Sequence, residues 1–335
     1  MPWLMFVLSA TLIVVAGTKL SQYGDRIAEH TGLGRLWIGV VLLAGATSLP
    51  EAFTAISAVL IDAPNIAVGD LFGAGLSNML TLALIDLAYR EKRVWQQAAL
   101  EQVLIAALAI VLTGLAGLLI VVQQPIPIQG VGPGTVAIAA IYVLGMRVVF
   151  RQEDMRRREK ERERIVEAGE AHRAASTEAL RRASIGFAVA ALALLAAAPM
   201  LAESAKEIAA STGLSTTFIG TSLVAVITSL PELVTSFAAV RLGALDLAVG
   251  NLFGSNAINM AVLFLADAAY RKGPLLASIE PTHAVTALLS ILLMSVGLMG
   301  IIYRAEKRFP LIEPDSVLMI VGYLSGMWLL FRIGG

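Results

Sequence analysis

A five-residue motif that contains both a proline and a glutamate occurs twice in this chain. The sequence Thr-Ser-Leu-Pro-Glu fills residues 47–51 and returns at residues 228–232, an offset of 181 residues (228 − 47). The same offset relates further pairs: Gly69 and Gly250, Gly73 and Gly254, Asn78 and Asn259, Asp86 and Asp267, and Tyr142 and Tyr323. A repeat of this extent predicts two halves with the same internal fold.

Both copies of the motif lie in sequence that is apolar enough to enter a bilayer. The chain has 335 residues, 57% hydrophobic and 15% charged. Its apolar residues form blocks of about 20, the length that spans hydrocarbon. We therefore predict an all-α integral membrane protein with ten transmembrane helices, at residues 3–19, 36–60, 65–89, 98–122, 133–150, 184–202, 217–241, 246–270, 281–303 and 314–332. The first block has no basic leader, so we expect a retained helix rather than a cleaved signal.

Composition excludes several other classes of function. The formal net charge is zero, which gives no electrostatic reason to expect a nucleic-acid partner. Cysteine is absent, so disulfides and thiolate metal sites are impossible. The three histidines, His30, His172 and His283, are far apart in the sequence, and we expect no histidine metal site. No cofactor is predicted, and the expected partners are the lipid bilayer and inorganic cations.

Basic residues predict the orientation in the membrane. Lysine and arginine gather in the odd-numbered connections between the predicted spans, whereas the second and fourth connections have none. Arg271 and Lys272 in the eighth connection are the main exception. The positive-inside rule then puts the odd connections in the cytoplasm and both termini outside, and we expect the plasma membrane of a prokaryote.

The number of spans in each half predicts an inverted repeat. Five is odd, so the second half must enter the membrane from the opposite side, with a pseudo-two-fold axis in the membrane plane. We predict a first five-helix repeat at residues 1–150 and a second, inverted five-helix repeat at residues 184–335. Residues 151–183 are rich in both acids and bases and are expected to form a charged cytoplasmic linker helix.

A proline inside each motif-bearing span is expected to break the helix. Pro50 has no N–H to give to the carbonyl of Ala46, and its ring distorts the turn. The carbonyls near Ala44, Ala46 and Thr47 are thereby partly freed, and in lipid they need another partner, which a bound cation would supply.

The side chains around the proline are those that a hard cation prefers. Thr47, Ser48 and Glu51 share one helix face at spacings of three and four residues. Carboxylate, hydroxyl and carbonyl oxygens suit Ca²⁺ or Na⁺ better than soft metals. The second half repeats the set with Ala225, Thr228, Ser229, Pro231 and Glu232.

The next span in each half carries a second motif. Gly69 and Gly73 are four residues apart, a spacing that lets helices approach closely and would bring Asn78 towards the glutamates. The matching residues of the second half are Gly250, Gly254 and Asn259, and Ser255 is one turn before Asn259. Asp86 and Asp267, at the span ends beside Tyr and Arg, are expected to be interfacial anchors.

Each feature has a structural alternative when taken alone. A membrane proline is often a kink, a Gly-x-x-x-Gly motif is often packing, and a single Asn often bonds two helices. An ionisable residue inside a span favours function by default, because burying it in lipid is unfavourable. Two glutamates at matching positions, each with Pro before it and Thr-Ser nearby, therefore predict an ion site between the halves.

The two blocks resemble the α-repeats of the cation/calcium antiporter superfamily, the membrane region of sodium/calcium exchangers. The family pattern is close to G-T-S-L-P-E in one helix and G-N-x-x-G-S-N-x-x-N/D in the next, in both halves. The second half carries Gly250-Asn251, then Gly254-Ser255-Asn256, and then Asn259. The likeness covers nearly the whole chain, because ten spans with a central cytoplasmic connection are also the architecture of the family.

The resemblance implies a role for each matching position. Glu51 and Glu232 would be the central calcium ligands, completed by the backbone carbonyls of Thr47 and Thr228. Flanking sodium sites would use Ser48, Ser229, Ser255 and the carbonyls of Ala44 and Ala225. Asn78 and Asn259 would line the centre.

The first half departs from the family pattern. Ala74 stands where the pattern has a serine, which removes a hydroxyl expected at one sodium site, and Gly75 replaces the following asparagine. Asp70 replaces the earlier asparagine and either substitutes for the lost ligand or carries a proton. These departures leave two driving ions open, Na⁺ and H⁺.

We expect a secondary antiporter, not an enzyme. It would exchange Ca²⁺ for Na⁺ by alternating access at a midplane site, and the alternative is H⁺ exchange for Ca²⁺ or another divalent cation. The first and sixth spans, less polar and peripheral, are candidates to slide against the rest. An intramembrane enzyme with a proton-sharing pair of acids, and a channel, are the rivals from other classes.

Overall fold

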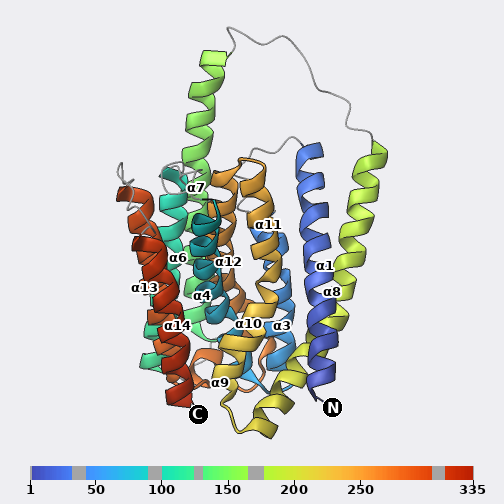
Figure 1. Cartoon of the computed structure of the whole chain (residues 1–335), viewed down its shortest axis with the longest axis vertical. Coiled ribbons are helices and arrows are strands. Elements are labelled where there is room, and N and C mark those ends of the chain that lie inside the picture. The colour runs from blue at the N-terminus through green and yellow to red at the C-terminus, as the bar shows by residue number, and fades with distance from the viewer. Residues whose placement is uncertain are drawn as a thin grey trace.

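The computed structural model describes residues 2–31, 43–89, 100–123, 131–164, 177–303 and 314–334, which form helices joined by short turns (Figure 1). The first half contains α1 (Pro2–Thr31), α2 (Ala44–Thr47), α3 (Leu49–Leu60), α4 (Pro64–Ala88), α6 (Leu100–Val122) and α7 (Pro133–Arg164). The second half contains α8 (Thr177–Thr212), α9 (Thr216–Ile219), the π-helical η3 (Gly220–Val224), α10 (Ala225–Thr228), α11 (Leu230–Arg241), α12 (Leu245–Ala269), the 3-10 turn η4 (Leu275–Ala277), α13 (Thr282–Tyr303) and α14 (Pro314–Gly334).

The apolar helices agree with the predicted spans in place but not always in length. Among the described residues, eight helices are long and apolar enough to cross a membrane, or nine if the bent α9–α11 segment is one span. Each predicted span overlaps a helix, and the described part of the second begins at Leu43 because residues 32–42 lie outside the described residues. Helices α1 and α8 extend well beyond the predicted 3–19 and 184–202, and α8 continues through Pro199.

Equivalent helices of the two halves run in opposite directions. In Figure 1, α1 rises from the N-terminus at the bottom, and α8, its sequence equivalent, descends beside it. Helix α7 rises, whereas α14 descends to the C-terminus, which lies at the same end of the molecule as the N-terminus (Figure 1). The broken segment α9–α10–α11 climbs from the bottom towards the top.

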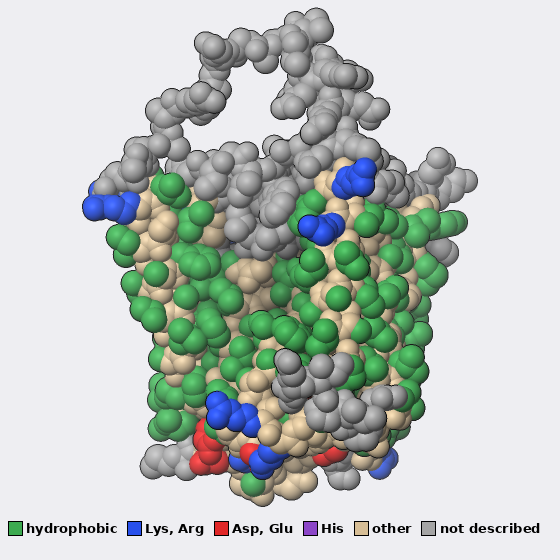
Figure 2. Space-filling model, turned by 180° about the vertical axis from the view of Figure 1, so that it is seen from behind, with side chains coloured by type: hydrophobic (Ala, Val, Ile, Leu, Met, Phe, Trp, Pro, Cys, Tyr) green, Lys and Arg blue, Asp and Glu red, His purple; other side chains and the backbone are tan. Residues whose placement is uncertain are grey.

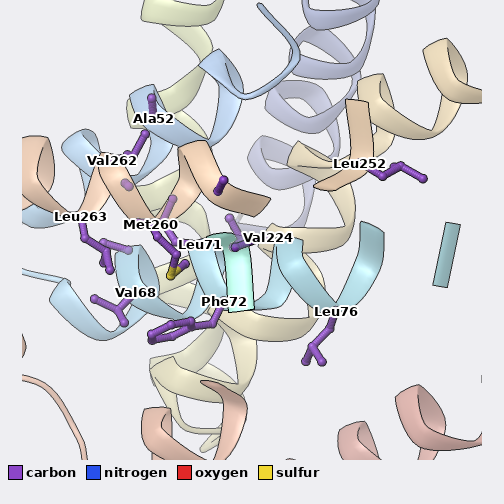
Figure 3. Close-up of a cluster of buried hydrophobic side chains, with 14 of the residues drawn as sticks. Ala52, Val68, Leu71, Phe72, Leu76, Val224, Leu252, Met260, Val262 and Leu263 are labelled. Carbon is purple, nitrogen blue, oxygen red and sulfur yellow. The ribbon is translucent and has the colours of Figure 1, made fainter. Parts of the chain in front are cut away.

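Helices α4 and α12 form the centre of the bundle. Both are more buried than any other candidate span, with 78% of the apolar window inside the protein. Leu71 and Phe72 of α4 and Met260 and Leu263 of α12 meet in the hydrophobic core of Figure 3. Because most of the surface of these helices is covered by protein, their buried polar side chains must find partners inside the protein.

The outer surface is apolar where a bilayer would surround it. Figure 2 shows hydrophobic side chains over the middle of one face, with lysine and arginine side chains near its two ends. Exposed Val7, Val148, Leu192 and Leu292 come from four different peripheral helices. This distribution is the one expected of an integral membrane protein.

The predicted linker is partly an extension of its neighbours. Helix α7 continues without a break through residues 151–164, and α8 already begins at Thr177. Residues 165–176 lie outside the described residues. The division into repeats at residues 150 and 184 stays a prediction.

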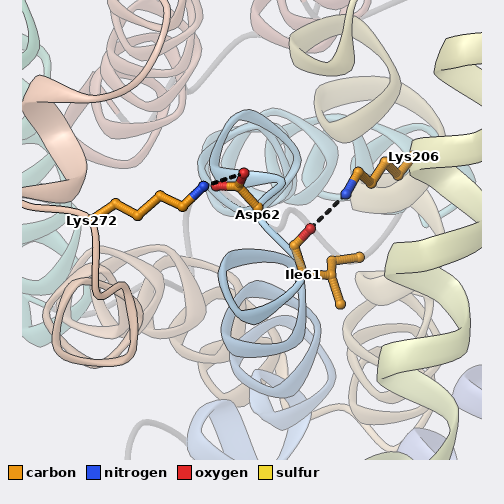
Figure 4. Close-up of polar contacts among 4 residues, drawn as sticks. All are labelled: Ile61, Asp62, Lys206 and Lys272. Carbon is orange, nitrogen blue, oxygen red and sulfur yellow. Dashed lines mark hydrogen bonds and ion pairs between the residues drawn. The ribbon is translucent and has the colours of Figure 1, made fainter.

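Two lysines of the second half contact the turn between α3 and α4 of the first half (Figure 4). Nζ of Lys206 donates to the carbonyl of Ile61 at 2.6 Å, and Nζ of Lys272 pairs with Asp62 at 2.5 Å. Asp62 has a φ of 62°, and Gly243, its sequence equivalent, has a φ of 82°. The hydrogen bond to Asp62 raises the pKa of Lys272. Both partners of this ion pair are exposed, so it adds little to stability.

Candidate functional site

Each motif-bearing span breaks at a serine, two residues before its proline. Ser48 separates α2 from α3 with φ −81° and ψ 2°, and Ser229 separates α10 from α11 with φ −84° and ψ 0°. Pro50 and Pro231 are in the first turns of α3 and α11, where a missing N–H is tolerated. The glutamates therefore lie in the first turn of a new helix, whose N-terminal dipole favours negative charge.

The two glutamates are fully buried, and each accepts a hydrogen bond from the opposite half. Ser229 Oγ donates to Glu51 Oε1 at 3.3 Å, and Ser48 Oγ donates to Glu232 Oε1 at 3.5 Å. Both carboxyl groups are 0% exposed. The site is thus shared between the halves, because the serine of each motif serves the glutamate of the other.

The threonine of each motif also contacts a polar side chain of the other half. Thr228 Oγ1 donates to Asp70 Oδ1 at 2.7 Å. Thr47 Oγ1 lies 3.3 Å from Asn251 Oδ1 and 3.3 Å from Ser255 Oγ. Asp70 and Asn251 are sequence equivalents. One motif threonine therefore faces a carboxyl group, and the other faces an amide.

Several oxygen atoms of the predicted site residues are buried and have no hydrogen-bond partner. They are Oε2 of Glu51 and Glu232, Oδ2 of Asp70, and Oδ1 of Asn78 and Asn259. No lysine or arginine is among the buried side chains of the described residues, so no basic group neutralises the three acids. Unpaired buried acceptors around uncompensated carboxyl groups favour a cation or a proton as the missing partner.

The donor set is mixed rather than purely acidic. Within the described residues, no three His, Cys, Asp or Glu side chains come close enough to hold a metal ion together. The two glutamates would instead work with hydroxyl, amide and carbonyl oxygens, which are the ligands of Ca²⁺ and Na⁺. His283 is buried elsewhere, with Nε2 at 3.1 Å from Thr217 Oγ1 and 3.2 Å from Asn65 Oδ1. The side chain of His30 and the whole of His172 lie outside the described residues.

The predicted carbonyl ligands have partners in this conformation. Ala44 O accepts from Ser48 N at 2.9 Å and from Thr47 Oγ1 at 3.2 Å. Ala225 O likewise accepts from Ser229 N at 3.1 Å and from Thr228 Oγ1 at 3.2 Å. An ion at these carbonyls would have to displace the threonine hydroxyls, and the ligand role of Ala44 and Ala225 stays a prediction.

Glycines bring α4 against the broken span of the other half, as their spacing predicts. A Cβ on Gly73 would lie 2.4 Å from the carbonyl oxygen of Thr221, and a Cβ on Gly69 would lie 3.0 Å from that of Thr217. Gly220 of η3 faces α4 just as closely, with its Cβ position 2.7 Å from the carbonyl oxygen of Ile66. This contact sets Asp70 beside Thr228.

Four polar residues near the site carry no role in the sequence-based prediction. Asn256 Oδ1 accepts from Asn78 Nδ2 at 2.8 Å. Asn251 Nδ2 donates to Thr235 Oγ1 at 3.3 Å and to Ser236 Oγ at 3.1 Å. The sequence contains a signal for these four residues. Both asparagines belong to the second motif, and the two hydroxyls lie three and four residues after Glu232.

Known proteins resemble this chain along most of its length. The model of the family described as "Sodium/calcium exchanger protein" matches residues 1–150 and 183–332. The inner membrane protein YrbG of Escherichia coli (strain K12) is 25% identical over 270 residues, which are 80% of each protein.

Two kinds of exchanger of solved structure share the fold. The sodium-calcium exchanger NCX_Mj matches with a TM-score of 0.61 and 20% identity, over 98% of this chain and 97% of that one. The H⁺/Ca²⁺ exchanger CAX matches with a TM-score of 0.73 and 13% identity, over 99% of this chain and 85% of that one. At these identities the likeness concerns the fold alone.

Proposed function

Because this chain belongs to the sodium/calcium exchanger protein family, and is thus a membrane cation antiporter rather than an enzyme, we propose that it exchanges Ca²⁺ for Na⁺. Exchange would proceed by alternating access at a site between Glu51 and Glu232. The observation that supports this most is the pair of buried carboxyl groups from opposite halves, each with one unpaired oxygen. Competition of the two ions for these shared oxygens would couple their movements.

The architecture that we propose has ten transmembrane helices in two inverted five-helix repeats. The opposite directions of α1 and α8, and of α7 and α14, support it (Figure 1). We place the charged connection between the repeats in the cytoplasm and both termini outside. The inner-membrane location of the Escherichia coli relative supports a prokaryotic plasma membrane.

The proposed ligands divide by ion. Ca²⁺ would bind the carboxylates of Glu51 and Glu232 and the carbonyls of Thr47 and Thr228. Na⁺ would use the flanking oxygens of Ser48, Ser229, Ser255, Ala44 and Ala225, and Asn78 and Asn259 would line the centre. Two carboxylates neutralise one Ca²⁺ or two Na⁺, so loaded forms can cross a low-dielectric barrier that the empty form crosses poorly.

The test is Ca²⁺ uptake into proteoliposomes loaded with Na⁺. Glu51→Gln and Glu232→Gln are each expected to reduce uptake to the level of empty liposomes, because the amide keeps the shape but removes the charge. Glu203→Gln, at an exposed acid on α8, is the matched control and should transport normally. Uptake that survives both site changes would contradict the assignment.

A second candidate function is H⁺-driven exchange on the same fold. Its support is the asymmetry between Asp70, which accepts from Thr228, and its equivalent Asn251. Ala74 also lacks the hydroxyl that Ser255 contributes in the other half. Asp70 would then supply an exchangeable proton in place of one Na⁺ site.

A pH gradient imposed without Na⁺ separates the two functions. If protons drive exchange, this gradient alone supports Ca²⁺ uptake, and Asp70→Asn removes that uptake because an amide cannot exchange a proton. If Na⁺ alone drives exchange, the pH gradient supports none. The control is the same variant under a Na⁺ gradient, which reports whether the Ca²⁺ site is intact.

A further inference from the structure

A polar cluster joins the beginnings of three helices at the end of the bundle where the chain termini lie. Its members are Asn65 at the start of α4, Thr217 of α9, and Glu280, Thr282 and His283 at the start of α13. Figure 1 shows α9 at this end of the molecule, between the two termini. One member belongs to the first half and four belong to the second, so the cluster fastens the halves to each other.

The carboxylate of Glu280 is the centre of this cluster. Glu280 Oε1 accepts from Asn65 Nδ2 at 3.2 Å. Glu280 Oε2 accepts from Thr217 Oγ1 at 2.9 Å and from Thr282 Oγ1 at 3.3 Å. The backbone N–H of Glu280 in turn donates to Asn65 Oδ1 at 2.9 Å. Because hydrogen bonds to a charged acceptor are the strong ones, Glu280 holds both α4 and α9 to the start of α13.

His283 joins the same three helices through one ring nitrogen. His283 Nε2 lies 3.1 Å from Thr217 Oγ1 and 3.2 Å from Asn65 Oδ1. Thr217 has a single hydroxyl proton, which it gives to Glu280, and an amide oxygen can only accept. Nε2 must therefore carry the proton and donate to both partners. Thr217 and His283 are 3% and 0% exposed, so water does not compete for these bonds.

Helix α9 begins the broken span that continues through η3 and α10 to Thr228 and Glu232. Its backbone lies against α4, because a Cβ on Gly69 would be 3.0 Å from both the carbonyl oxygen of Thr217 and the nitrogen of Thr221. Glu280 and His283 bond to α9 and to α4 at the same time. The two helices therefore cannot separate at this end without breaking bonds of the cluster.

The repeat does not duplicate this cluster. At the offset of 181 residues, Thr217, Glu280, His283 and Asn65 correspond to Leu36, Ala99, Gln102 and Asp246, respectively. Leucine and alanine have no hydrogen-bonding side chain, so the bond between Thr217 and Glu280 has no equivalent. Gln102 Nε2 donates to the backbone carbonyl of Asp246 at 3.2 Å, which is a bond between neutral groups. The carboxylate-centred cluster thus belongs to one end of a structure that is otherwise repeated.

We propose that Asn65, Thr217, Glu280 and His283 form a latch that holds the cation site closed towards the end of the bundle where the chain termini lie. Opening on this side must break hydrogen bonds to a carboxylate and to an imidazole. The latch therefore favours conformations in which this side is closed. The inference rests on the proposed function, because a latch has a task only where the site opens to each side of the membrane in turn.

A single cysteine one turn beyond the latch reports its opening. Thr221→Cys is suited to this, because Thr221 is 0% exposed, its hydroxyl has no hydrogen-bond partner, and the chain has no cysteine of its own. The rate at which an impermeant reagent labels a buried thiol follows the population of the open form when opening and closing are fast. Right-side-out and inside-out vesicles present the two ends in turn. Asp62→Cys, at an exposed position three residues before Asn65, identifies the vesicles in which the latch end faces the reagent.

Thr217→Val removes the hydroxyl between Glu280 and His283 and keeps the shape of the side chain. We expect this change to raise the labelling rate of Thr221→Cys from the latch end by about tenfold, the effect of losing one hydrogen bond to a charged group, and not from the opposite end. Thr113→Val is the matched control, because Thr113 is 2% exposed and its hydroxyl donates to a carbonyl of its own helix. An unchanged rate, or an equal rise from both ends, would overturn the latch.

Glu280→Ala tests whether the bonds act as one unit. We expect an increase in labelling at least as large as that of Thr217→Val, because three side-chain donors share this carboxylate. In a Glu280→Ala background, Thr217→Val should add little, because the acceptor of its hydroxyl is already gone. Additive effects of the two changes would overturn the shared latch.

Na⁺-driven Ca²⁺ uptake by wild-type protein separates failure of the latch from failure of the proposed function, because labelling does not depend on which ions are carried. A tenfold rise in labelling by Thr217→Val, in a protein that shows no such uptake, would overturn the proposed exchange and support the latch. Unchanged labelling by Thr217→Val, in a protein that does exchange the two ions, would overturn the latch alone.

Discussion

Two buried acids of this protein, Asp267 and Glu51, differ in their hydrogen bonds. Asp267 accepts from the backbone N–H of Gly132 at 2.8 Å and of Leu275 at 2.7 Å, and it also accepts from the hydroxyl of Thr135. Both of its oxygens are therefore occupied, whereas Glu51 keeps one oxygen unpaired. Asp267 is thus a satisfied carboxylate that joins α12 to α7 and η4, whereas Glu51 keeps an oxygen that a ligand could occupy.

Asp86 and Asp267, which the sequence predicts to be interfacial anchors, are both buried inside the protein. They are 2% and 0% exposed, and each joins a central helix to the N-terminal part of a neighbour. Ser316 Oγ donates to Asp86 Oδ2 at 2.7 Å, as Thr135 donates to Asp267, but Asp86 Oδ1 is buried and unpaired. The bonds to an N-terminal N–H and hydroxyl could not be read from the sequence, because they join residues more than a hundred positions apart.

We expect Asp267→Asn to destabilise the fold by about 1–3 kcal/mol, the effect of leaving a buried backbone donor without an acceptor. Asparagine has one acceptor oxygen, so its NH₂ group would face a backbone N–H. Thermal unfolding in detergent measures the change. Asp62→Asn is the control. Asp62 is exposed, and asparagine tolerates the positive φ of this position. Equal unfolding temperatures for the two variants would contradict the structural role.

At the scale of elements, the central contact joins α4 to the π-helical segment η3. The sequence predicts a close approach from Gly69 and Gly73, and the structure confirms it. It does not predict that the partner is a π-helix within the seventh span. Within η3, the backbone at Gly220 faces Ile66 of α4 without side chains between them.

A methyl group at position 73 should disturb this contact. We expect Gly73→Ala to destabilise the protein by about 1–3 kcal/mol and to lower transport, because its Cβ would approach the Thr221 carbonyl oxygen to 2.4 Å. The measurements are thermal unfolding and ion uptake. Gly45→Ala is the matched control, since a Cβ at Gly45 meets no atom within 4 Å. Similar behaviour of the two variants would show that α4 and η3 do not pack as described.

At the scale of the whole molecule, the halves depend on each other for the site. Each glutamate accepts from a serine of the other half, and each motif threonine reaches the facing α4 or α12. A half on its own would leave these polar groups exposed to lipid without partners. The long pair α1 and α8 contacts this centre from the side, where a Cβ on Gly17 would lie 2.6 Å from Pro231 Cγ and 3.2 Å from Pro50 Cγ.

The inverted arrangement predicts that equivalent turns open to opposite sides of the membrane. The chain has no cysteine, so single cysteines can be labelled without background. We expect Leu242→Cys, 87% exposed after α11, to react only with reagent on the cytoplasmic side. Asp62→Cys, in the equivalent turn between α3 and α4, should react only from outside. Labelling of both positions from the same side would contradict the proposed topology.

Much of the architecture was determined by local sequence. Apolar length indicates the spans, proline indicates where a helix must break, and the duplicated glutamate indicates the candidate site, because each of these effects acts within one helix. The partner of each polar group was decided only by tertiary structure. Ser48 faces Glu232 rather than Glu51, and Ser290 fills the space at Gly75, because these contacts depend on how helices from opposite halves pack. Packing of segments distant in the sequence leaves no local pattern, so the sequence does not show which side chains of the two halves face one another.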